Sequence, residues 1–123
     1  MADALALWQT SVDAQTASTY FNWGTVNQKS TGDLLFRVHN SSTVYSAISV
    51  VVSLADVGTP ATPSQAATHL LSTDGLLFAA TVTIDVIPPL STTAPIILRR
   101  VTPAAATLGA FTYSVTATAT SWL

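Results

Sequence analysis

The sequence contains no cysteine and no glutamate among its 123 residues. Without cysteine, the chain can form neither a disulfide framework nor a thiolate metal site. There are four basic and six acidic residues, so only 8% of the chain is charged, against roughly 25% in a typical soluble domain. A surface with so few charges is weakly protected against association. We therefore expect much of it to be covered by a partner or to belong to an assembly outside the cell.

Three further absences limit the possible partners. The basic residues form no cluster, and Arg99 and Arg100 are neighbours on a predicted strand, where they point to opposite faces, so we expect no nucleic-acid binding. No apolar run reaches the roughly 18 residues that a membrane-spanning helix requires. Residues 1–5 carry an aspartate and no basic charge, which predicts that no Sec signal peptide is present.

Threonine and serine, by contrast, number 20 and 13. Threonine suits exposed strand positions, because its β-branched side chain favours extended backbone and its hydroxyl is hydrated without carrying charge. Residues 111–120 alternate apolar and hydroxyl side chains without a break, which predicts a strand with one dry and one hydrated face. Trp122 falls on the hydroxyl face, so we expect either a bulge or a contact of Trp122 outside the core.

The same alternation predicts further strands. Residues 34–39 and 45–54 are separated by the turn-forming segment 40–42, which predicts an antiparallel hairpin. Residues 78–87 form a strand that a Pro-Pro pair ends, since proline cannot donate to a ladder, and residues 96–101 form another. In the first of these strands, Leu34, Phe36 and Val38 share one face, and Leu35, Arg37 and His39 share the other. The side chains expected to face inward on the strands at 45–54 and 78–87 are Ile48, Val50, Val52, Leu54, Phe78, Ala80, Val82, Ile84 and Val86.

Two short helical turns are expected between strands. The run Thr62-Pro63-Ser64-Gln65 fits a capped helix start, and apolar residues recur at helical spacing as far as Leu71. Thr102-Pro103 repeats the start pattern, and Gly109 suits the position after a helix end.

About seven strands with one or two short helical turns predict an all-β fold, an antiparallel immunoglobulin-like β-sandwich. The length predicts one domain. We assign residues 20–123 to this sandwich and residues 1–19 to an N-terminal arm or edge strand.

No catalytic or metal-binding constellation is apparent. His39 and His69 are the only histidines, whereas a zinc site needs three or four convergent ligands. No serine lies in a Gly-x-Ser-x-Gly elbow. Asp33, Asp56 and Asp74 could contribute to a calcium site, but aspartate in predicted loops more often serves turn formation. We therefore expect no enzyme activity, no cofactor and no metal.

Aromatic side chains are the candidates for partner binding, because tryptophan and tyrosine are enriched among interface anchors. Trp8 and Trp122 lie near the chain ends, outside the densest predicted core. The predicted interface anchors are Trp8, Tyr20, Phe21 and Trp122. With Trp23 and Tyr113, these aromatics could instead form a carbohydrate platform or pack in the core.

Several runs are similar to known families. The Trp23-Gly24 pair, residues 32–42 and residues 46–54 resemble immunoglobulin-like modules built around a strand that ends in Val-x-Asn-x-Ser, which is Val38-His39-Asn40-Ser41-Ser42 in this sequence. This resemblance implies the sandwich fold and carries no catalytic residues.

Residues 72–78, 96–103 and 117–122 resemble small structural proteins of tailed bacteriophage virions. This resemblance implies a head-decoration or tail component, assembled in the host cytoplasm and located in the virion. Its partners would be neighbouring capsid or tail subunits, together with further copies of itself. The alternative is a β-sandwich module that binds carbohydrate or a cell surface.

Overall fold

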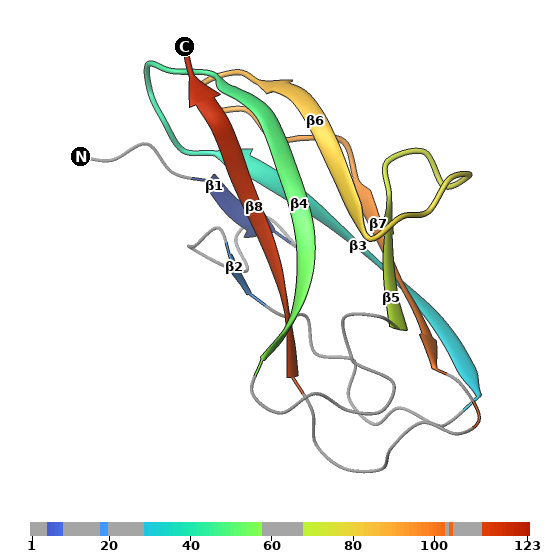
Figure 1. The fold of residues 1–123 in the computed structure, drawn as a ribbon. Coiled ribbons are helices and arrows are strands. Elements are labelled where there is room, and N and C mark those ends of the chain that lie inside the picture. The colour runs from blue at the N-terminus through green and yellow to red at the C-terminus, as the bar shows by residue number, and fades with distance from the viewer. Residues whose placement is uncertain (1–4, 9–17, 20–28, 58–67, 103, 105–111) are drawn as a thin grey trace.

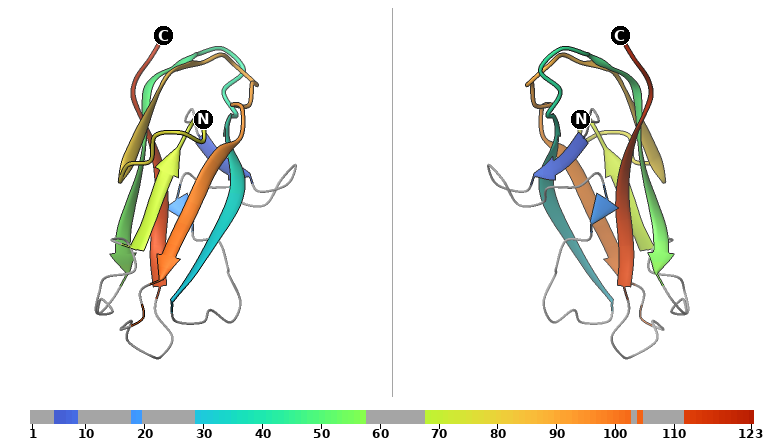
Figure 2. Two further views of the ribbon diagram at one scale, coloured as in Figure 1. Left: turned by 90° about the vertical axis from the view of Figure 1, so that its right-hand side faces the viewer. Right: turned by 90° about the vertical axis from the view of Figure 1, so that its left-hand side faces the viewer.

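The computed structural model describes residues 5–8, 18–19, 29–57, 68–102, 104 and 112–123. These residues form eight strands in two four-stranded antiparallel sheets that face one another (Figures 1 and 2), which confirms the predicted all-β fold. None of them lies in an α-helix. The strands are β1 (Leu5–Trp8), β2 (Ser18–Thr19), β3 (Ser30–Asn40), β4 (Ala47–Val57), β5 (His69–Ser72), β6 (Thr81–Ile87), β7 (Ile96–Thr102) and β8 (Thr112–Trp122).

One sheet has the strand order β1-β3-β7-β5 and the other the order β2-β8-β4-β6. Apolar side chains from both sheets meet between them, where the removal of apolar surface from water stabilises the fold. Phe36 is the largest fully buried side chain, and Leu35 beside it is exposed, as the alternation in β3 predicts. The buried cluster contains Leu5, Leu7, Phe36, Val38, Ala47, Val50, Val52, Leu71, Ile87, Ile96, Leu98, Tyr113, Val115 and Ala117.

The N-terminal segment contributes to both sheets. β1 is an edge strand that pairs with the last four residues of β3, and its Leu5 and Leu7 enter the core. The two residues of β2 pair with β8 on the other sheet. Within the described residues, the start of the chain is therefore an edge strand and part of the hydrophobic core.

The predicted hairpin between the third and fourth strands is wrong. β3 pairs with β1 and β7, whereas β4 pairs with β6 and β8, so the connection after Asn40 crosses from one sheet to the other. The fully buried Asn40 side chain stabilises this crossing, because it donates to carbonyl groups of both the crossing loop and the end of β6. A sequence pattern identifies the turn residues but not the sheet that receives the next strand.

The helical turn predicted as far as Leu71 is also wrong in its described part. Leu70 and Leu71 belong to β5, which pairs with β7, and Leu71 is fully buried. Tertiary burial has overridden a weak local helix signal. Residues 62–67 lie outside the described residues, as does nearly all of the second predicted turn at 102–109.

The alternation of buried and exposed side chains is interrupted at neighbouring positions of the paired strands β6, β4 and β8. In β4 the buried residues Ala47 and Val50 are three positions apart, where an even spacing would keep one face inward. Ser49, between them, has a positive φ of 49° and takes no part in either ladder of β4. The same spacing of three separates the inward residues Ile84 and Ile87 of β6, which pair with Val50 and Ala47 of β4.

This change of face resolves the alternatives for Trp122. In β8, Ala119 and Trp122 both pack against the core although they are three residues apart, so a break in the alternation brings the Trp122 ring inward. It also corrects the expectation that Val86 faces inward: Val86 is half exposed, and Ile87 is buried in its place.

Substitutions at Ser49 test the change of face. A β-branched residue is disfavoured at positive φ, so Ser49→Val is expected to destabilise the fold by about 2 kcal/mol. Ser49→Gly has no Cβ and is expected to be neutral or stabilising by up to about 1 kcal/mol. Urea unfolding measures both. In a regular strand valine would instead be favourable, so a more stable Ser49→Val variant would contradict the described backbone.

Candidate interaction surfaces

The predicted anchor Trp8 lies at the end of edge strand β1 and is half-buried. Its indole stacks on the imidazole of His39, with ring centroids 4.0 Å apart and an angle of 12° between the planes. His39 Nδ1 lies 2.9 Å from Thr92 Oγ1, and burial lowers the pKa of His39, which favours the neutral ring. The contact with His39 thus positions the half-buried Trp8 side chain at the edge of its sheet.

The other predicted anchors have different positions. Trp122 belongs to the opposite sheet from Trp8 and packs against the core, as described above. Tyr20 and Phe21 lie outside the described residues. Of the four predicted anchors, the two that the structure describes, Trp8 and Trp122, lie in different sheets, and the role of all four as interface anchors stays a prediction.

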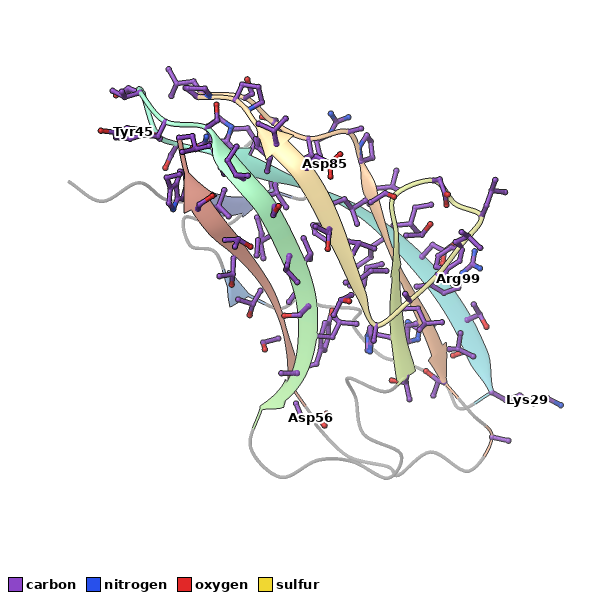
Figure 3. All side chains as sticks on the ribbon, turned by 45° about the horizontal axis from the view of Figure 1, so that its top comes forward. Lys29, Tyr45, Asp56, Asp85 and Arg99 are labelled. Atoms are coloured by element: carbon purple, nitrogen blue, oxygen red, sulfur yellow. The ribbon has the colours of Figure 1, made fainter. Side chains whose placement is uncertain are left out.

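At the end of the sandwich that carries the C-terminus (Figure 1), the chain forms the β3–β4 and β6–β7 connections, and these segments carry exposed apolar residues. Backbone hydrogen bonds join the β3–β4 connection to the β6–β7 connection and to the C-terminal residue. Leu90 N donates to Ser42 O at 3.0 Å, and Ser46 and Leu123 exchange two bonds of 2.8 and 3.0 Å. Tyr45 marks this end in Figure 3. The set, which we call the apolar end, consists of Val44, Tyr45, Leu90 and Leu123, exposed by 68%, 47%, 60% and 75%.

The buried amide of Asn40 holds the apolar end together. Its Nδ2 donates to the carbonyl oxygens of Tyr45 and Ile87, both at 2.9 Å, while Oδ1 accepts from Ser42 N at 2.9 Å. The hydroxyl of Ser42 then accepts from the backbone N–H groups of Val44 and Tyr45. Since buried polar groups that find partners rigidify a loop, the exposed side chains stand on a fixed frame.

The loop between β5 and β6 exposes a second pair of large apolar residues, Leu76 and Leu77, by 83% and 79%. Asp74 Oδ1 accepts from the N–H groups of both leucines, at 2.8 and 3.0 Å. Ser72 Oγ accepts from Gly75 N at 2.8 Å and donates to Asp74 Oδ1 at 3.1 Å. These bonds, led by the backbone N–H of Leu76, lower the pKa of the Asp74 carboxyl, so the loop frame is intact at neutral pH.

The side chains weighed for catalysis or metal binding have other partners. Asp33 lies in β3, not in a predicted loop, and its carboxylate binds Arg99 through two bonds of 2.9 and 3.0 Å, which lower the pKa of Asp33. His69 is fully buried and stacks on Tyr113 with centroids 4.1 Å apart. In the part of the chain that the structure describes, no three His, Asp or Glu side chains group as metal ligands.

Sequence reasoning missed both exposed apolar groups. Leu76 and Leu77 follow an Asp-Gly turn directly, and Val44 and Leu90 follow other turn residues, so apolar side chains inside predicted turns were the available signal. No family model, curated protein or solved structure matches the chain. No helix of the described residues is long and apolar enough to cross a bilayer.

Proposed function

We propose that the chain is a non-enzymatic structural protein of a bacteriophage virion, which binds neighbouring capsid or tail subunits through the apolar end. The observation that carries the proposal is the set of four large apolar side chains held outward on a hydrogen-bonded frame. Contiguous exposed apolar patches mark interaction sites on soluble proteins. A rigid frame favours binding further, because little conformational entropy is lost on association.

The rest of the molecule is consistent with a structural role. Only 8% of the chain is charged, and the strands expose uncharged hydroxyl side chains such as those of Thr81, Thr83 and Thr118. Such a surface tolerates close neighbours with few unpaired buried charges. The resemblance of three runs to virion proteins supplies the phage context, and an immunoglobulin-like strand topology forms part of the same proposal.

The carbohydrate alternative finds less support. A sugar-binding platform needs several exposed aromatic rings side by side. Among the described aromatic residues, only Tyr45 is exposed, while Trp8 and Trp122 are half-buried. The apolar end is made mainly of aliphatic side chains, which suit a protein partner.

The test is whether the chain is a component of virus particles. Mass spectrometry of purified virions of the encoding phage is expected to find it in a fixed copy number, and Tyr45→Asp is expected to reduce incorporation at unchanged thermal stability. Val101→Asp, at an exposed site on β7 away from the apolar end, is the matched control. Absence from particles, together with no affinity for isolated capsids or tails, would overturn the proposal.

A further inference from the structure

The β5–β6 loop exposes apolar side chains, and a pocket beside it has a mostly apolar wall. The loop projects from the sandwich (Figure 1) and exposes Leu76 and Leu77, which we call the leucine knob. The pocket has a volume of about 230 Å³. Its wall includes Ile84 of β6, Pro95, and Ile96, the first residue of β7. The geometry points to self-association in which the leucine knob of one copy enters the pocket of a second copy.

The size and lining of the pocket favour side chains as its occupant. A cavity of about 150 Å³ holds a benzene-sized group, whereas pockets for drug-sized ligands begin at about 300 Å³. The volume of this pocket lies between these values. Its wall is mostly apolar and contains no charged side chain; the polar groups of its lining include the hydroxyls of Thr73, Thr83 and Thr93. An uncharged, apolar occupant such as one or two leucine side chains therefore leaves no buried charge unpaired.

Charges beside the two surfaces are opposite in sign. Asp74 lies next to the leucine knob, and Arg37 Nη1 approaches the carbonyl oxygen of Thr93, at the pocket, to 3.4 Å. Within the described residues the one ion pair joins Asp33 and Arg99, so the charges of Asp74 and Arg37 are not engaged in ion pairs there. A second copy brings these two charges together when the knob meets the pocket.

Two further charged side chains lie near the proposed contact. Arg99 lies beside the β5–β6 loop, with its guanidinium 4.1 Å from the centre of the Phe78 ring, and Asp85 follows Ile84 on β6 (Figure 3). The Arg99 guanidinium already pairs with Asp33, so the charge complementarity of the contact rests on Asp74 and Arg37. Opposite charges on facing surfaces favour one register and raise the association rate.

The knob and pocket also lie close enough for a reciprocal contact. Thr73 lines the pocket and precedes Leu76 by only three residues. Two copies related by a two-fold axis can therefore exchange knobs, which closes the assembly as a dimer. This inference deepens the proposed structural role, on which its biological meaning rests, by naming the surface through which copies bind.

Sedimentation velocity of the purified full chain over a range of concentrations tests the contact. The wild-type chain is expected to form dimers, and Leu76→Asp is expected to weaken dimerisation about tenfold or more, as loss of an interface anchor does. Ala94→Trp, which fills the pocket from its lining, is expected to do the same. Val101→Asp is the matched control and is expected to dimerise like the wild type.

Mixing the two variants gives a sharper result. In a reciprocal dimer, the Leu76→Asp copy keeps its pocket and the Ala94→Trp copy keeps its knob, so the mixture is expected to form heterodimers through one intact contact. A wild-type chain that stays monomeric at millimolar concentration would overturn the inference, as would dimers that neither variant weakens or a mixture that associates no better than each variant alone.

These outcomes separate the inference from the proposed function. A monomeric chain that is still incorporated into virions leaves the structural role standing and removes the knob contact. A dimer that Leu76→Asp disrupts, formed by a chain absent from virions, supports the contact and removes the virion role.

Discussion

Phe36→Ala is expected to destabilise the protein by about 4 kcal/mol. Phe36 is the largest fully buried side chain and lies between the two sheets, so its truncation removes apolar contacts and leaves a cavity that neighbouring strands cannot close. Such a loss is a large part of the typical 5–15 kcal/mol of a folded domain. Equilibrium urea unfolding followed by tryptophan fluorescence measures it, and Phe36→Leu, which leaves a smaller cavity, is expected to fall between wild type and alanine.

The neighbouring residue supplies the control. Leu35 lies on the same strand with its side chain 55% exposed, so Leu35→Ala is expected to change stability by less than about 0.5 kcal/mol. The two truncations remove similar chemistry one position apart. If Leu35→Ala proved the more damaging, the assignment of the inner face of β3 would be reversed.

Asn40→Ala is expected to cost about 3 kcal/mol, the second largest effect. The side chain is fully buried, and its removal leaves the carbonyl oxygens of Tyr45 and Ile87 and the N–H of Ser42 without their present partner. Each buried polar group left unsatisfied costs roughly 1–3 kcal/mol. Amide hydrogen exchange is expected to show loss of protection in the β3–β4 connection before the rest of the fold opens.

Two variants separate this network from general effects of the loop. Asn40→Asp keeps an acceptor for Ser42 but loses the three bonds that Nδ2 donates to the carbonyl oxygens of Tyr45, Ile87 and Pro88, and is expected to be nearly as unstable as alanine. Thr43→Ala, at an exposed position of the same connection, is expected to be neutral. A stability change below about 0.5 kcal/mol for Asn40→Ala would mean that the amide does not hold the crossing between sheets.

The local predictions were confirmed where a short pattern decides the structure. The strands at 34–39, 96–101 and the C-terminus form as predicted, because alternation of apolar and polar side chains requires an extended chain with one buried face. The aspartates show the limit of this reasoning. Asp33 and Asp56 were assigned to loops by residue type, whereas both lie in strands, where Asp33 has the cross-strand partner Arg99.

The sequence by itself determined the all-β class, the low charge and which side chains of β3 share a face, since each depends on residue identity or on spacing of two along the chain. Only the tertiary structure decided that β4 crosses to the second sheet, that Leu70 and Leu71 extend as β5, and that Trp122 turns inward. These features depend on partners far apart in sequence: a buried amide, a neighbouring strand and a change of face shared by three strands. Local spacing contains no information on such partners. The apolar end depends on the same kind of long-range contact, whereas local bonds of Ser72 and Asp74 hold the leucine knob.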